Sequence, residues 1–234
     1  MALTWIPNTL TLARCALAFV AAGAIVVAGY GGLQPLRLTG AGAWSAGPLS
    51  VGQAMPAAQL ALVAFTLAAV TDLLDGWEAR RLKAESAFGA WLDPIADKLL
   101  VGLSLVALTL FAEPVWLIAI PAIAILARDG WVTYLRASRG GGHALPVMAL
   151  AKWKTALELA GIIILLAYWP FFWVVSGHSV DFIRPSPGGV ATAAFFIPLG
   201  IVSLWVAAAL SLYTGWRYVQ AYRAGEAPIS DTFD

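Results

Sequence analysis

Cysteine and histidine are both scarce in this chain of 234 residues. The single cysteine, Cys15, cannot form an intramolecular disulfide, and with only two histidines there is no Cys/His cluster with the spacing of zinc ligands. No Ser/His or Cys/His pair is placed to make a covalent nucleophile, because His143 and His178 fall in predicted loops and Cys15 has apolar neighbours. Any metal ion must therefore be held by oxygen atoms.

An excess of charge of one sign is also missing. The 14 Lys and Arg residues against 13 Asp and Glu give a formal net charge of +1, and charged residues make up only 12% of the chain. This balance excludes a basic nucleic-acid-binding protein and an acidic disordered chain. We expect no nucleic-acid partner.

Long apolar sequence is what the chain has in abundance. Hydrophobic residues make up 61% of it and the mean hydropathy is +0.81, values typical of a polytopic membrane protein. Six apolar stretches are each close to the ~20 residues that a membrane helix needs, and they are continuous where the strands of a barrel would alternate. These stretches are residues 8–29, 56–80, 87–112, 114–138, 149–174 and 190–216. They predict an all-α, polytopic integral membrane protein with six transmembrane helices in a single domain, residues 1–225, followed by a disordered cytoplasmic tail, residues 226–234.

Basic residues predict the orientation, because cytoplasmic loops hold the excess of Lys and Arg. With both termini inside, the outer side carries only Arg37 and Arg184, in the long connections at residues 31–53 and 176–189. The inner side carries Arg80, Arg81, Lys83, Arg136, Arg139, Lys152, Lys154, Arg217 and Arg223. No Lys or Arg precedes the first apolar stretch, so we expect a retained helix instead of a cleaved signal.

Four aspartates lie where the second and third stretches meet, and the simplest interpretation is a solvated loop. Length argues against it: residues 56–71 would span about 24 Å and residues 99–112 about 21 Å at 1.5 Å per residue, less than a hydrocarbon core of about 30 Å. We therefore expect Asp72 and Asp75 on the last turns of one helix, and Asp93 and Asp97 on the first turns of the next.

Their spacing predicts a metal site. Separations of three and four residues put each pair on one helix face, and a tight hairpin would turn the two faces together. Four charges inside a membrane would cost on the order of 10 kcal/mol on insertion scales. Arg80 and Lys98 could offset part of this cost, but four oxygen ligands suit one or two Mg²⁺ or Mn²⁺ ions better. For Asp93 an alternative is a helix N-cap before Pro94.

The residues between the acids suit a phosphorylated ligand. The small residues Gly76, Ala79 and Gly89 would keep a groove open, and Arg80 can bind a phosphate through its planar guanidinium group. The alternatives are that the small residues serve helix packing and that the basic residues only set the topology.

The pattern Asp72-x2-Asp75-Gly76-x2-Ala79-Arg80-x8-Gly89-x3-Asp93-x3-Asp97 resembles, at every fixed position, the CDP-alcohol phosphatidyltransferases. The resemblance implies a six-helix membrane fold, usually a homodimer, with a polar cavity open to the cytoplasm and two divalent cations. Its chemistry would be attack of an alcohol on the lipid-linked phosphate of a CDP-lipid, with release of CMP.

Three further segments, at residues 6–14, 90–98 and 152–155, are similar to the bacterial branch of this family, over residues 5–166 in all. That branch implies CDP-diacylglycerol and glycerol 3-phosphate as substrates, at the cytoplasmic face of a bacterial inner membrane. Two positions depart from its pattern: Asp129 stands where glutamate is expected after Arg128, and Ala151 where glycine is expected before Lys152.

The resemblance also implies roles for the site residues. Asp72, Asp75, Asp93 and Asp97 would be the metal ligands, with Asp93 and Asp97 catalytic and Asp97 the general base on the acceptor hydroxyl. The CDP-lipid would be bound by Asn8, Asp72, Gly76, Ala79, Arg80 and Gly89.

Glycerol 3-phosphate is a dianion, so its enzyme needs a basic pocket beside the metals. Arg128 and Arg136 are eight residues apart and share a helix face, and Asp129 is not expected to contact Arg128, because adjacent helical residues do not face each other. The candidates for the acceptor phosphate are Arg14, Arg128, Arg136, Lys152 and Lys154. Arg136 and Lys152 could instead be topogenic or contact lipid head groups.

Three alternatives stay open. Two are enzymes of the same family with another acceptor. One would use an inositol phosphate, and the other, a cardiolipin synthase, would use phosphatidylglycerol. The third is a cation transporter, which predicts acids spread through the bilayer depth with broken helices at the midplane. The clustering of the acids near the inner edge, beside arginines, favours the enzyme.

Overall fold

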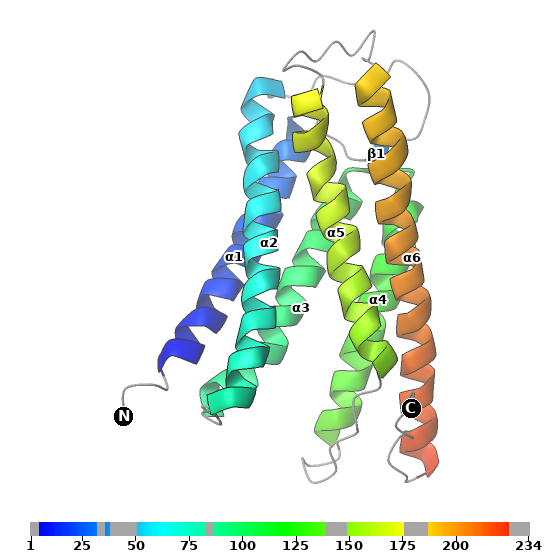
Figure 1. Cartoon of the computed structure of the whole chain (residues 1–234). Helices are drawn as coiled ribbons and strands as arrows, with labels where there is room; N and C mark the ends of the chain where they lie inside the picture. Colours follow the sequence, from blue (N-terminus) through cyan, green and yellow to red (C-terminus); the bar gives the residue numbers. More distant parts are fainter. Residues whose placement is uncertain are drawn as a thin grey trace.

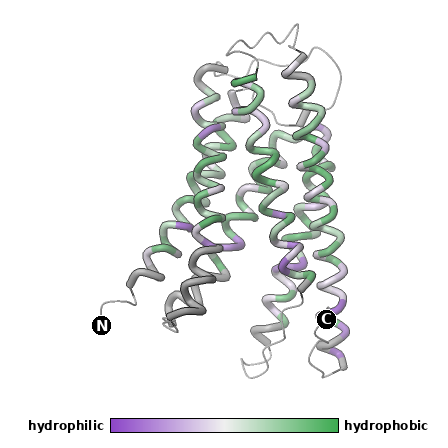
Figure 2. The backbone as a smooth tube through the Cα atoms, in the orientation of Figure 1, coloured by the Kyte–Doolittle hydropathy of each residue, from purple (hydrophilic) through white to green (hydrophobic). Residues whose placement is uncertain are grey.

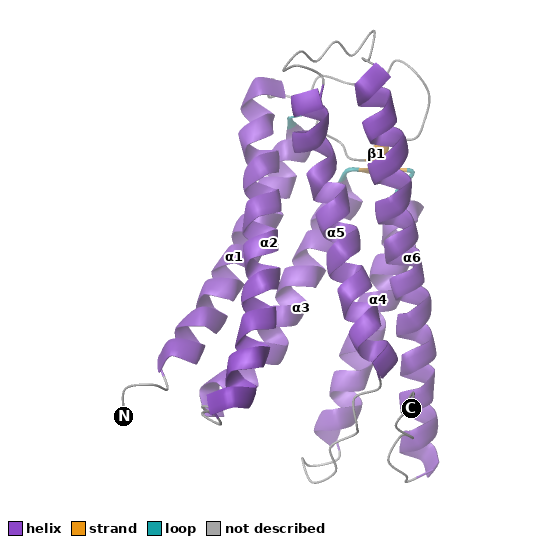
Figure 3. Ribbon diagram, viewed as in Figure 1, coloured by secondary structure: helices purple, strands orange, loops and turns teal. Residues whose placement is uncertain are grey.

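A computed structural model describes residues 5–31, 36–37, 51–82, 87–138, 149–175 and 187–224. Within these ranges the chain forms six helices and two strands of two residues each (Figures 1 and 3). The helices are α1 (Trp5–Tyr30), α2 (Val51–Leu82), α3 (Ala87–Leu110), α4 (Trp116–Ser138), α5 (Ala149–Val175) and α6 (Pro187–Ala224). The strands β1 (Leu36–Arg37) and β2 (Ala112–Glu113) pair in parallel. Each predicted apolar stretch corresponds to one helix, which confirms the all-α class.

The second helix starts earlier than the sequence suggested. α2 begins at Val51, and Pro56 lies inside it, five residues after the start, where the proline removes one helical hydrogen bond without ending the helix. Residues 51–71 alone therefore span about 31 Å at 1.5 Å per residue, so the length argument for the second helix is wrong. Its conclusion holds for another reason: α2 and α3 are helical through all four aspartate positions, which excludes the solvated loop.

Among the described residues, five helices are long and apolar enough to cross a membrane. The five spans are Thr9–Tyr30, Ala54–Asp72, Trp116–Leu135, Leu150–Val175 and Ala191–Gln220. α3 is not among them, because Asp93, Asp97 and Lys98 interrupt its first half and leave a shorter apolar remainder. The findings therefore indicate a multi-pass membrane protein, and the sixth crossing stays a prediction.

The described helices pack in two groups, one of α1, α2 and α3 and the other of α4, α5 and α6. α1 packs against both α2 and α3, and α6 packs against both α4 and α5. Contacts of α2 with α5 and of α3 with α4 join the groups. α1 begins and α6 ends at the same end of the bundle, the lower end in Figure 1.

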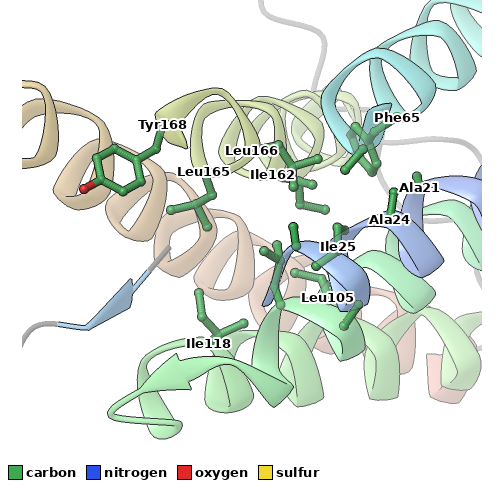
Figure 4. Packing of buried hydrophobic residues seen from close by; sticks show 14 of the residues in the cluster. Ala21, Ala24, Ile25, Phe65, Leu105, Ile118, Ile162, Leu165, Leu166 and Tyr168 are labelled. Atoms are coloured by element: carbon green, nitrogen blue, oxygen red, sulfur yellow. The ribbon is translucent and has the colours of Figure 1, made fainter. Parts of the chain in front are cut away.

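Small residues let the helices approach closely. Much of the buried core is alanine, and Figure 4 shows the larger side chains Phe65, Leu105 and Ile162 of α2, α3 and α5 filling the space between them. At the α5–α6 contact, a Cβ added to Gly200 would lie 2.6 Å from Cγ of Leu165. This contact therefore depends on the missing side chain, as is usual where membrane helices pack closely.

Polar residues are confined largely to one half of the bundle. Figure 2 shows mostly hydrophobic residues in the half away from the start of α1, with a few hydrophilic positions, and more hydrophilic ones nearer the end where α1 begins. Ion pairs of Arg14 in α1 with Asp72 in α2, and of Lys154 in α5 with Asp129 in α4, bring charges of neighbouring helices to the same depth within each pair.

Gly200→Ala should lower the free energy of unfolding by about 1–3 kcal/mol, because the new methyl group overpacks the α5–α6 contact. The matched control is Gly23→Ala, where nothing lies within 4 Å of the added Cβ and no loss is expected. Thermal unfolding of the purified protein in detergent measures both. Equal unfolding temperatures for the two variants would contradict this account of the contact.

Candidate functional site

A buried ion pair joins α1 to α2 at the level of the polar half. Nη1 of Arg14 lies 2.7 Å from Oδ1 of Asp72, and the side chains are 2% and 35% exposed. A guanidinium this deeply buried requires an anionic partner. Sequence reasoning had proposed Arg80 and Lys98 as partners of the acids and did not foresee this one.

Asp97 of α3 lines the same pocket as Asp129 of α4 and Lys154 of α5. Two groups of charges contribute to its electrostatic environment: Asp72 with Arg14, and Asp129 with Lys154. The first group comes from α1 and α2, and the second from α4 and α5. Asp97 is thus the residue at which the acids of the sequence pattern meet the basic residues predicted for the acceptor.

The second group is a chain of ion pairs centred on Asp129. Nζ of Lys154 donates hydrogen bonds to both carboxylate oxygens of Asp129, at 2.6 and 2.7 Å, and Nη1 of Arg128 donates to Oδ1 at 3.0 Å. Lys154 also lies 2.9 Å from Oε1 of Glu158, one turn along α5, and both of these side chains are almost fully buried. Two cations therefore converge on one carboxylate, a geometry that suits anion recognition.

These contacts correct one expectation and add one residue that was not predicted. Arg128 does contact its neighbour Asp129, because the long arginine side chain can curl back although the two Cβ atoms point apart. Glu158 was not among the predicted residues, although its spacing of four from Lys154 on one helix was a usable signal.

Arg128 is held from a third helix. Its Nη2 donates a hydrogen bond of 3.0 Å to Oγ1 of Thr214 in α6, and its guanidinium carbon lies 5.4 Å from the ring centroid of Tyr218. Both α6 residues are fully buried. α4, α5 and α6 thus all contribute to the position of the basic residues.

Charged residues of α3, α4 and α5 line a pocket with a cavity volume of about 190 Å³, which has room for a small ligand but is below the usual range for drug-sized ones. Lys98, beside Asp97, donates a hydrogen bond to Thr133 across the pocket. The charged lining residues are Asp97, Lys98, Arg128, Asp129, Lys154 and Glu158. Three are acidic and three basic, so the lining is formally neutral, and two of its cations, Arg128 and Lys154, already have carboxylate partners.

The other predicted residues stand as follows. Arg14 is paired with Asp72 and is not part of the pocket lining, and the Lys152 side chain is exposed. Eight more lie in helices, but their side chains are outside the described part of the structure: Asn8, Asp75, Gly76, Ala79, Arg80, Gly89, Asp93 and Arg136. Among the described side chains, no group of three or more His, Cys, Asp or Glu residues is placed to hold a metal ion. The metal set and the nucleotide pocket therefore stay predictions.

Comparison with known proteins shows the class. The chain belongs to the CDP-alcohol phosphatidyltransferase family, whose model matches residues 4–216, and it is therefore a phosphotransferase of that family.

Two relatives have the same printed name, CDP-diacylglycerol–glycerol-3-phosphate 3-phosphatidyltransferase. One, from Cereibacter sphaeroides, is 41% identical over 177 residues, which cover 68% of this chain and 79% of the relative. The other, from Bacillus subtilis, is 33% identical over 217 residues, covering 91% and 92%. A cardiolipin synthase (CMP-forming) from rice is 35% identical over 162 residues, covering 64% of this chain and 44% of the relative.

Lys154→Met should lower the free energy of unfolding by about 3 kcal/mol. The substitution removes the cation paired with the buried carboxylate of Glu158 and one of the two cations paired with Asp129. Lys152→Met, two residues earlier with an exposed side chain, is the matched control and should change it by less than about 0.5 kcal/mol. Thermal unfolding in detergent compares them. If both variants unfold at the same temperature as the wild type, the buried ion pairs do not stabilise the fold as described.

Proposed function

We propose that the protein transfers the phosphatidyl group of CDP-diacylglycerol to the hydroxyl of glycerol 3-phosphate, giving phosphatidylglycerophosphate and CMP. The relatives' names and family membership support this reaction. The structural observation that carries it is that Asp97 lines the same pocket as the convergent cations Arg128 and Lys154. A phosphate-bearing acceptor in the pocket would have its hydroxyl near Asp97 and its phosphate near those cations.

The donor set fits Mg²⁺ or Mn²⁺, two per site by family resemblance. Asp72 and Asp97 offer carboxylate oxygens, which hard divalent cations prefer, and Asp75 and Asp93 lie one helical turn from them. When bound, the ions would shield the negative charge that develops on the transferred phosphate. Arg14, paired with Asp72, would hold that carboxylate in place.

In this proposal the chain's own residues bind and orient the two substrates. Arg80 would hold the diphosphate of the CDP-lipid, with Asn8, Gly76, Ala79 and Gly89 lining the nucleotide pocket. Arg128 and Lys154 would take the acceptor's phosphate, which can replace the Asp129 carboxylate as their anionic partner. Arg136 and Lys152 would extend this basic surface toward the cytoplasm.

Asp97 would accept the proton of the acceptor hydroxyl as that oxygen attacks. CMP is a good leaving group, so the reaction needs no covalent enzyme intermediate and no nucleophilic side chain. We further propose that the termini and the site face the cytoplasm, from the distribution of basic residues, and that the enzyme is a homodimer, from the family resemblance.

A cardiolipin synthase is the second candidate, because the rice relative has that name. Its acceptor would be a lipid, whereas Arg128 and Lys154 both line a cavity of only about 190 Å³. The pocket geometry therefore favours the small anionic acceptor.

The reaction is tested with the purified full chain, labelled CDP-diacylglycerol, Mg²⁺ or Mn²⁺, and four separate acceptors: glycerol 3-phosphate, inositol phosphate, serine and phosphatidylglycerol. We expect metal-dependent CMP release with glycerol 3-phosphate alone, and its loss when EDTA removes the metal. Release only with phosphatidylglycerol would make the protein a cardiolipin synthase. No release with any acceptor would refute the proposed reaction.

Asp97→Asn should lower kcat by about 10²–10⁴-fold, because the amide cannot accept the hydroxyl proton. CDP-diacylglycerol binding, measured separately on the same variant, should be largely retained. Turnover close to that of the wild type would remove Asp97 from the role of base.

A further inference from the structure

The last helix, α6, makes a set of contacts to Arg128 that the proposed reaction does not explain. Nη2 of Arg128 donates to Thr214, 86 residues away in sequence, and the face of the Tyr218 ring lies under the guanidinium. Between them Gly215 leaves room for the arginine: a Cβ at this position would lie 2.8 Å from Cγ of Arg128. We name Thr214, Gly215 and Tyr218 the α6 platform.

The Thr214 hydroxyl is oriented to receive a cation. Its oxygen lies 2.8 Å from the backbone oxygen of Leu210 and 3.1 Å from that of Ser211. A hydroxyl has one proton, and these carbonyls can only accept it. The lone pairs of Oγ1 are therefore left for Arg128, whose guanidinium can only donate.

The platform restricts the arginine in three independent ways. The Thr214 hydroxyl fixes one end of the guanidinium group. The ring of the fully buried Tyr218 fixes the plane of the guanidinium through a cation–π contact. The absent side chain at Gly215 lets the aliphatic stem lie against α6. An arginine fixed before its ligand arrives loses less side-chain entropy on binding.

We propose that the α6 platform positions Arg128 for the phosphate of the acceptor and so sets the enzyme's affinity for a phosphate-bearing acceptor. This inference rests on the proposed function. Thr214, Gly215 and Tyr218 are positioning residues, since they act through Arg128 and not on the reacting atoms.

The test compares Thr214→Val, which keeps the shape and removes the hydroxyl, with Thr214→Ser, which restores it. We expect Thr214→Val to raise KM and Kd for glycerol 3-phosphate about tenfold, the scale of one hydrogen bond to a charged group. Its kcat and its KM for CDP-diacylglycerol should stay within about twofold of the wild type, and Thr214→Ser should return KM close to the wild-type value.

The matched control is Thr192→Val, in the same helix. Thr192 is buried and makes the same hydroxyl bond to a backbone carbonyl four residues earlier, to Gly188 at 2.8 Å, and no contact of it with Arg128 is observed. Loss of the Thr192 hydroxyl should leave KM for glycerol 3-phosphate unchanged. A rise equal to that of Thr214→Val would mean that a helix defect, and not the platform, is responsible.

A double-mutant cycle with Arg128→Ala tests whether the platform acts through the arginine. Once Arg128 is removed, Thr214→Val should have no further effect on affinity, because coupled residues are not additive. Gly215→Ala displaces the arginine stem, so it should also lower the affinity for glycerol 3-phosphate. It too should have no further effect once Arg128 is removed. An unchanged affinity in Thr214→Val, or full additivity with Arg128→Ala, would overturn the proposal.

Direct calorimetric binding of glycerol 3-phosphate to the full chain separates this inference from the reaction itself. If the wild type binds the ligand and Thr214→Val binds it more weakly, the platform stands even when the turnover assay fails. If the wild type turns over but Thr214→Val binds equally well, the reaction stands and the platform is refuted. A wild type that does not bind glycerol 3-phosphate at all would refute the platform directly.

Discussion

A charge inside an apolar helical bundle must have a counter-charge, because an unpaired ion away from water costs several kcal/mol. This constraint accounts for the arrangement of the described polar residues. Arg14 is buried against Asp72, and Lys154 lies between Asp129 and Glu158. The apolar core needs no such pairing and is made of closely packed alanines together with larger aliphatic and aromatic side chains. The buried charges therefore lie in the part of the bundle whose sequence is not explained by packing alone.

The pairing also suits a binding site for anions. Arg128 and Lys154, two cations of the pocket, are held by the Asp129 carboxylate, and the lining is formally neutral. In the proposed reaction, the acceptor's phosphate would take the place of that carboxylate on Arg128 and Lys154. Asp97, which lines the same pocket, would connect the acceptor's hydroxyl to the acids that are expected to hold metal. In this way the counter-charges that make the bundle possible would also arrange the two substrates.

Much of this arrangement follows from local sequence. Continuous apolar runs determine where the helices lie, and both helices continue through Asp72 and Asp97. The start of α2 was missed because Pro56 resembles the first residue of a helix, whereas the helix begins five residues earlier, at Val51. Partners distant in sequence were missed as well: Arg14 with Asp72 and Arg128 with Thr214 depend on which helices pack together. Glu158 was open to prediction from its spacing to Lys154.

The central claim is that acids of α2 and α3 gather around divalent ions beside the cations of α4 and α5. The most direct measurement is a crystal structure of the full chain with Mn²⁺ and CDP, using the anomalous signal of manganese. The account predicts anomalous peaks in contact with carboxylate oxygens of both Asp72 and Asp97. Crystals of catalytically competent protein, saturated with Mn²⁺, in which no peak lies beside these two side chains would contradict it.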